Sequence, residues 1–438
     1  MNPLASELNT IIEGSCPALF GVLSQLGKEL YFPRGILTQT AEAREKAYRY
    51  NATIGIARSG GEAMYLGSVI GRIKGLSADQ ALDYAPSTGN PGLRRAWLDR
   101  MLRKNPSLSG KEISLPVVTS GITHGLTITG ELFVDPGDVV LLPDKFWGNY
   151  GMIYGIRRGA NIRTFPFFTG SGGFNIEGMA ALLDEVLSEK GKAILLLNFP
   201  NNPTGYSIKK KEAGELARAL AAVTGPGRDA VVVADDAYFG LFYDDDVLTE
   251  SVFGLLAGES EHLFPVKLDG ATKEMYVWGL RTGFVTFSAL VGGREKEVYS
   301  ALEKKVGGTI RGNISNCPQL SQSILLEAMG DPGFADQAAE KHALMKSRAL
   351  KVREVLDNPD FARVWEPYPF NAGYFMCLRL KDVDAEELRV RLIEQYGVGV
   401  IAEGGTDIRI AFSSLEVDEI PDLFDIMYRC AMEMQQGA

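Results

Sequence analysis

The residues of this chain that could carry chemistry lie just after apolar runs typical of buried strands. Lys273 precedes a Gly-x-Arg-x-Gly turn that contains Arg281, and an Asp-x-x-Tyr motif joins Asp235 to Tyr238. Asn202 follows another apolar run. A neutral lysine amine can condense with an aldehyde, and a carboxylate can keep a ring nitrogen protonated. With donors for a ring oxygen and a phosphate, these residue types provide what a pyridoxal 5'-phosphate enzyme requires.

The order and spacing of these motifs resemble the fold-type I aminotransferases, in the class I/II branch that includes the aspartate and aromatic aminotransferases. The resemblance extends from Gly55 to Arg409. It implies that Lys273 forms the Schiff base with the cofactor and later moves the α-proton of the substrate. That role requires a pKa well below the ordinary value of roughly 10.4. The resemblance also pairs Asp235 with the ring nitrogen.

The resemblance further implies how the cofactor is held. Tyr238 and Asn202 would donate to the ring oxygen, with Ala237 beneath the ring and Trp147 stacked above it. A phosphate is bound well by backbone amides at a helix N-terminus together with a fixed cation. The implied phosphate contacts are Gly121, Ile122, Thr123, Thr272, Arg281 and Tyr84, the last reaching the phosphate of the neighbouring subunit.

Two positions depart from the family pattern. Tyr150 stands where many aspartate aminotransferases have a histidine that supports the ring-nitrogen aspartate, and Gly270 stands where a phosphate-binding serine is usual. Asp236 would point away from Asp235 on an extended chain, so we expect it at the surface or as a cap. His124 is expected to be structural, and three histidines in the whole chain support no metal cluster.

Substrate recognition also follows from the resemblance. Arg409 matches the arginine that binds the α-carboxylate, Gly55 matches the glycine that closes over that carboxylate, and Asn202 lies beside it. Arg311 matches the arginine that crosses a dimer interface to pair with the distal carboxylate of a substrate. Aspartate or glutamate are therefore the first expected donors, and an aromatic amino acid comes next, in a ping-pong exchange with a 2-oxo acid.

The elements that position these residues alternate between short apolar strands and helices. Such alternation predicts an α/β fold with a mostly parallel sheet flanked by helices. A second, smaller α+β domain is expected from both termini. We expect an N-terminal arm and part of the small domain at 1–60, a large cofactor-binding domain at 61–334 and a C-terminal small domain at 335–438. The expected strands are 117–119, 139–142, 193–197, 230–233 and 284–287, and the clearest helices are 179–188, 211–222 and 334–356.

Composition limits the class of protein. The formal net charge of −10 over 438 residues argues against a nucleic-acid partner. Four cysteines without paired spacing, no signal-peptide pattern and no long apolar segment predict a cytoplasmic protein without a membrane span. The resemblance adds a homodimer with shared active sites.

Two other functions remain open at this stage. The same cofactor apparatus can serve β-elimination, as in C–S lyases, or racemisation or decarboxylation, because the electron sink does not choose which bond breaks. An aminotransferase-like regulator is the remote alternative. Regulators of that kind carry an N-terminal DNA-binding module, and the stretch before Gly55 shows no basic recognition helix.

Overall fold

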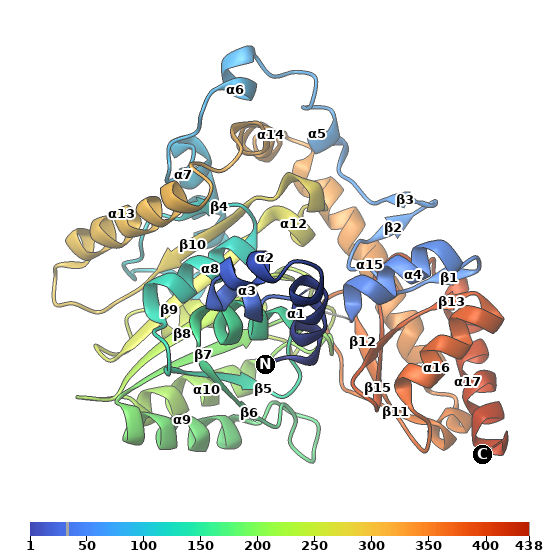
Figure 1. Ribbon diagram of the computed structural model, residues 1–438. Coiled ribbons are helices and arrows are strands. Elements are labelled where there is room, and N and C mark those ends of the chain that lie inside the picture. The colour runs from blue at the N-terminus through green and yellow to red at the C-terminus, as the bar shows by residue number, and fades with distance from the viewer. Residues whose placement is uncertain (32–34, 438) are drawn as a thin grey trace.

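The protein, described here from a computed structural model covering residues 1–31 and 35–437, is built around a seven-stranded sheet (Figure 1). Strands β5 to β9 run parallel, and β10 runs antiparallel to both of its neighbours. This arrangement confirms the predicted α/β fold class. The order across the sheet is β4 (Val117–Thr119), β10 (Gly283–Phe287), β9 (Leu263–Gly270), β8 (Asp229–Asp235), β7 (Lys192–Asn198), β5 (Val139–Pro143) and β6 (Asn161–Phe165).

Both faces of this sheet are buried, because successive residues of the central strands enter two different apolar cores. On β8, Val231 and Val233 pack with α8, whereas Val232 packs with α9 and α10 on the other face. The helices of this part are α5 (Gly67–Ile70), α6 (Ala78–Leu82), α7 (Pro91–Lys104), α8 (Ile122–Phe133), α9 (Ile176–Lys190), α10 (Lys210–Val223), α11 (Val252–Leu256), α12 (Ala271–Glu274), α13 (Glu295–Asn313) and α14 (Gln319–Met329).

A smaller antiparallel sheet lies beside the large one, as Figure 1 shows. Its order is β11 (Trp365–Pro367), β12 (Met376–Leu380), β15 (Asp407–Ile410) and β14 (Ile401–Glu403). The helices of this part are α15 (Phe334–Leu356), α16 (Ala385–Arg391) and α17 (Glu419–Gly437).

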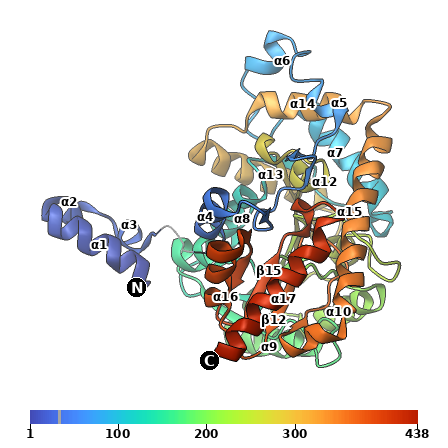
Figure 2. The same cartoon turned by 90° about the vertical axis from the view of Figure 1, so that its right-hand side faces the viewer.

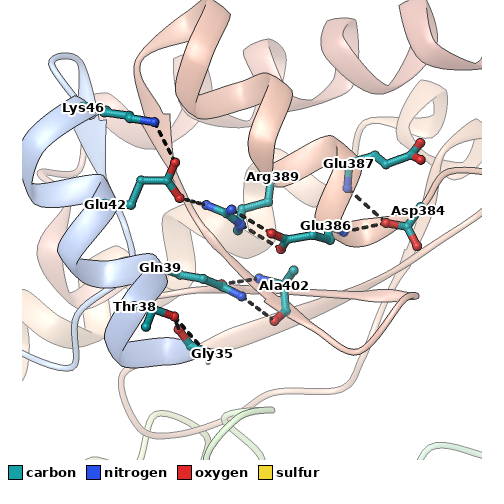
Figure 3. A network of polar contacts seen from close by, with 10 residues as sticks. All are labelled: Gly35, Thr38, Gln39, Glu42, Lys46, Asp384, Glu386, Glu387, Arg389 and Ala402. Carbon is teal, nitrogen blue, oxygen red and sulfur yellow. Dashed lines mark hydrogen bonds and ion pairs between the residues drawn. The ribbon is translucent and has the colours of Figure 1, made fainter. Parts of the chain in front are cut away.

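An N-terminal segment joins this smaller part. Strand β1 (Tyr50–Asn51) pairs with β13 (Val398–Gly399), and α4 (Ile36–Lys46) packs against β13 and β14. Figure 3 shows how α4 is attached: Glu42 accepts a 2.8 Å hydrogen bond from Arg389, and the Gln39 side chain bonds the backbone of Ala402 in both directions. The domain boundaries at 60 and 334 stay a prediction.

The first helices lie apart from the rest of the chain, as Figure 2 shows. They are α1 (Pro3–Ser15), α2 (Pro17–Val22) and α3 (Gln25–Glu29), and α1 contacts the other two. Strands β2 (Arg58–Ser59) and β3 (Glu62–Ala63) pair with each other in a short antiparallel hairpin. Across residues 1–31 and 35–437, no helix combines the length and the apolar character needed to cross a membrane.

Candidate active site

A cavity of about 700 Å³, partly open to solvent, lies at the carboxyl ends of the parallel strands β7 and β8. Ligands of open α/β sheets bind at this edge. Eleven of the residues predicted from the sequence or flagged there as departures line it. The lining residues are Ile36, Gly55, Ile122, Thr123, Trp147, Tyr150, Asn198, Asn202, Asp235, Ala237, Tyr238, Lys273, Phe375 and Arg409.

Lys273 lies in the short helix α12, immediately after β9. Burial lowers its pKa to about 8; the nearby Asp235 opposes this shift, and Arg281 adds to it. The Nζ atom lies 4.8 Å from the centre of the Tyr238 ring, and the Tyr374 hydroxyl donates to the backbone oxygen of Lys273. The lowered pKa gives this amine a much larger neutral fraction near neutral pH than an ordinary lysine has.

Asp235 is the last residue of β8 and is buried. The Tyr150 hydroxyl donates a 2.7 Å hydrogen bond to Oδ2 of Asp235, and the Ala237 amide donates to Oδ1 at 3.1 Å. Burial raises the pKa of Asp235, while the bond from Tyr150 and the charge of Lys273 act to lower it. Tyr150 thus supplies the contact to the aspartate that the family pattern assigns to a histidine.

Gly121 and Arg281 form a cradle beside the cavity. Gly121 precedes α8 with φ = +78°, and a Cβ there would lie 2.3 Å from Nη2 of Arg281. The guanidinium of Arg281 donates to the Trp278 carbonyl at 3.2 Å. An unblocked helix N-terminus with an adjacent guanidinium can bind a phosphate.

Gly270, which stands where the family pattern has a serine, has no room for a side chain. A Cβ at Gly270 would lie 2.8 Å from the Thr282 carbonyl oxygen and 3.0 Å from the Gly283 Cα. Both atoms belong to backbone, which cannot move aside as a flexible side chain can. This close approach of β9 and β10 excludes any residue larger than glycine here.

Arg409 is buried on β15 and projects toward Asn202. It donates to Oδ1 of Asn202 at 2.9 Å and to the Thr53 carbonyl at 3.0 Å, and it lies over the Phe375 ring. Arg409 and Lys273 therefore reach one cavity from the small and large parts of the chain. A guanidinium in this position can bind a carboxylate through two nitrogens.

Asp236 is a correction to the sequence analysis. Its side chain does point away from that of Asp235, but it is buried and forms an ion pair with Lys267, which also lies 3.2 Å from Asp269. The indole of Trp97 donates to Asp269 at 3.2 Å. The expected surface or cap role is wrong because β9 brings a lysine into the interior beside it.

Five predicted site residues do not line the cavity of this chain: Gly121 and Arg281, which lie beside it, Thr272, and the exposed residues Tyr84 and Arg311. Tyr84 is 89% exposed, and Arg311 is exposed on α13, where it donates to Ser315 at 2.6 Å. Both were expected to act on a neighbouring subunit, and that expectation stays a prediction. Thr272 is buried and lies next to Lys273 without lining the cavity, and His124 accepts a 3.1 Å hydrogen bond from the Ser120 amide.

Three lining residues were missed by the sequence analysis. Asn198 ends β7, and its side chain bonds both the Asp235 carbonyl and the Asn202 amide at 2.8 Å. Ile36 begins α4, and Phe375 precedes β12. The end of an apolar run could have indicated Asn198. Ile36 and Phe375 are apolar residues brought in by distant elements, so no local signal marks them.

Comparison with known proteins identifies relatives of this chain. The family model for aminotransferase class I and II matches residues 61–425. YugH of Bacillus subtilis, named as an aminotransferase, is 29% identical to this chain over 329 residues. The match covers 74% of this chain and 77% of YugH. An aspartate aminotransferase of Bacillus sp. strain YM-2 is 24% identical over 325 residues, 74% of this chain and 75% of that protein.

A solved structure shows the same fold. Kynurenine aminotransferase of Pyrococcus horikoshii, solved in complex with PMP, superposes with a TM-score of 0.77 at 17% identity, covering 95% of this chain and 98% of that one.

Proposed function

The chain belongs to the aminotransferase class I and II family and is an aminotransferase, and we propose that it moves an amino group between an amino acid and a 2-oxo acid. We propose pyridoxal 5'-phosphate as the cofactor, bound at Lys273. The observation that carries the proposal is a half-buried amine with a pKa of about 8 in one cavity with Asp235 and Arg409.

The residues around the cavity fit that cofactor. Gly121 and Arg281 leave a cradle that a single added methyl group would fill, and Arg281 would hold a phosphate there. Tyr238 and Asn202 offer donors for a ring oxygen, and Trp147 lines the cavity with a flat apolar ring. When bound, pyridoxal phosphate supplies an aldehyde and an electron-withdrawing ring that stabilises negative charge on the substrate's α-carbon.

Three side chains would perform the remaining work. Lys273, whose lowered pKa of about 8 gives it a far larger neutral fraction than an ordinary lysine has, accepts the α-proton and returns it at a different atom. Asp235, supported by Tyr150, holds a proton on the ring nitrogen. Arg409 binds the α-carboxylate and so orients the α-hydrogen toward Nζ of Lys273.

Substrate and assembly are finer parts of the proposal. Aspartate or glutamate with 2-oxoglutarate or oxaloacetate are the first candidates because of Arg311, and aromatic amino acids come next. Arg311 and Tyr84 are both exposed and lie off the cavity of their own chain, which supports a homodimer with shared sites. Four free cysteines support a cytoplasmic location.

The test uses purified protein loaded with pyridoxal phosphate. Borohydride reduction should leave a covalent label on the peptide that contains Lys273, and Lys273→Ala should lose both that label and transfer to 2-oxoglutarate. Release of pyruvate and ammonia in place of transfer would favour a β-eliminating lyase. A wild-type protein that takes no label would overturn the proposal.

A further inference from the structure

A partly buried ion pair joins the large and small sheets beside the cavity. Nζ of Lys145 lies 2.6 Å from Oδ2 of Asp407. Lys145 follows β5 of the large sheet, and Asp407 is the first residue of β15 in the small sheet. The Asp407 side chain is 5% exposed and the Lys145 side chain 24% exposed, so water reaches this contact only from the lysine side.

Each partner stands two residues from a side chain that lines the cavity. Trp147 follows Lys145 in the same loop, and Arg409 follows Asp407 on the same strand. Side chains two apart on a strand project from the same face. The ion pair therefore lies on the face of β15 from which Arg409 reaches the cavity.

A second set of contacts closes a ring. The side chain of Asn201 donates to the backbone oxygen of Lys145 at 3.1 Å, and the next residue, Asn202, accepts the 2.9 Å bond from Arg409. Starting at Lys145, the ring runs through Asp407, Arg409, Asn202 and Asn201 and returns to Lys145. A shift of β15, which carries Asp407 and Arg409, would therefore strain both the Lys145–Asp407 ion pair and the Arg409–Asn202 hydrogen bond.

The surroundings keep both charges in place. Tyr368 and Thr406 donate to Oδ1 of Asp407 at 3.2 and 3.0 Å, and the Lys145 ammonium lies 5.0 Å from the centre of the Tyr368 ring. Burial alone would lower the pKa of Lys145, but the bond to Asp407 raises it above the ordinary value. Glu403 and Arg379 are the cross-strand neighbours of Asp407.

We propose that the Lys145–Asp407 ion pair is a positioning contact that fixes Arg409 relative to Trp147 and so sets the affinity for the α-carboxylate of the substrate. This inference rests on the proposed function. The pair touches neither Lys273 nor the phosphate cradle, and the Asn201 bond to the Lys145 carbonyl holds the loop of Trp147 without it, so the pair acts mainly on amino-acid binding and leaves cofactor binding largely unchanged. The effect is the same for every amino acid, since all share the carboxylate that Arg409 binds.

The experiment compares Lys145→Met, Lys145→Arg and Lys192→Met as cofactor-loaded proteins. Lys192 forms an ion pair of the same length, 2.6 Å, with Asp138 at the opposite end of the large sheet. Spectroscopic titration gives Kd for 2-methylaspartate and 2-methylphenylalanine, which lack the α-hydrogen and therefore stop before proton transfer. Lys145→Met should raise both Kd values about tenfold, with the Kd of pyridoxal phosphate within about twofold of wild type. Lys145→Arg should restore most of the affinity, and Lys192→Met should match wild type.

Equal Kd values for Lys145→Met and wild type, or a parallel loss of cofactor affinity, would overturn the inference. Hydrogen–deuterium exchange on the same proteins gives a result that needs no substrate. Lys145→Met should speed exchange at residues 407–410 as well as around Trp147. Unchanged exchange on β15 would refute the proposal that the Lys145–Asp407 ion pair holds this strand in place. A wild-type protein that binds neither probe and takes no label at Lys273 would instead count against the proposed function.

Discussion

Gly121 and Arg281 touch so closely that no side chain fits between them. A Cβ on Gly121 would lie 2.3 Å from Nη2 and 2.9 Å from Cζ of Arg281. Gly121 also has φ = +78°, a conformation that residues with a Cβ rarely adopt. Gly121, which immediately precedes α8, therefore leaves the guanidinium its place at the helix N-terminus.

Replacing Gly121 should weaken cofactor binding more than it weakens folding. In Gly121→Ala the new methyl group displaces Arg281, so we expect the Kd of pyridoxal phosphate to rise tenfold or more. Gly137→Ala is the matched control, because Gly137 has φ = +90° but open space around its Cβ position. It should cost about 1 kcal/mol of folding stability and leave cofactor affinity unchanged. If the two variants bound pyridoxal phosphate with similar affinity, Gly121 and Arg281 would not form the phosphate site.

Tyr150 should act through Asp235. Tyr150→Phe removes the 2.7 Å bond and leaves a buried carboxylate short of a donor, so we expect kcat to fall about 10- to 100-fold. Tyr150→His restores a donor and should recover part of the loss. Tyr154→Phe is the control, since Tyr154 is equally buried but bonds Thr129. Should Tyr154→Phe reduce kcat as much as Tyr150→Phe, the loss would reflect packing and not the bond to Asp235.

Much of this arrangement was predictable because the site residues follow buried strands whose apolar runs are plain in the sequence. Strand β9 escaped prediction, since Lys267 and Asp269 interrupt its apolar pattern. Those charges are tolerated in the interior because Asp236 pairs with Lys267. A single sequence does not reveal that two charged residues from different strands will meet.

The departures at Tyr150 and Gly270 were visible in the sequence, but their meaning was not. The role of Tyr150 depends on a distance to Asp235 across the sheet edge, and Gly270 is fixed by the backbone of the adjacent strand β10. Ile36 likewise lines the cavity because α4 is held by contacts with α16 and β14 (Figure 3). All three features depend on contacts between residues far apart in the sequence, so no local sequence pattern predicts them.

Glu274 should stabilise the protein in a pH-dependent way. It is paired with Arg100 at 2.8 Å and with Lys104. Burial would raise its pKa, but the two cations lower it to about 2 from the ordinary 4.5. Because the pKa is lower in the folded state, the ionised carboxylate stabilises the fold above pH 4.5, and this stabilisation is lost as the pH falls toward 2. The shift corresponds to about 3 kcal/mol in the free energy of unfolding.

We therefore expect Glu274→Gln to lower the free energy of unfolding near neutral pH and to approach wild type in acid, as urea unfolding across a pH series would show. Glu297→Gln is the control, because Glu297 forms an exposed pair with Arg294 and should have little effect at any pH. If the difference in free energy of unfolding between Glu274→Gln and wild type stayed constant down to the most acidic condition, ionisation of Glu274 would not be the source of the stabilisation.

Substitution of Arg311 should show whether this residue selects dicarboxylic over aromatic donors. If it crosses to the cavity of a second subunit, Arg311→Leu leaves a distal carboxylate unpaired and should lower kcat/KM for aspartate about 100-fold. Phenylalanine has no such carboxylate, so its kcat/KM should change little or improve. Arg294→Leu serves as the control, because Arg294 lies at the other end of α13 and pairs with Glu297. Equal losses for aspartate and phenylalanine would remove Arg311 from the site and leave the apolar wall of Ile36, Trp147 and Phe375 as the part of the cavity that selects the substrate.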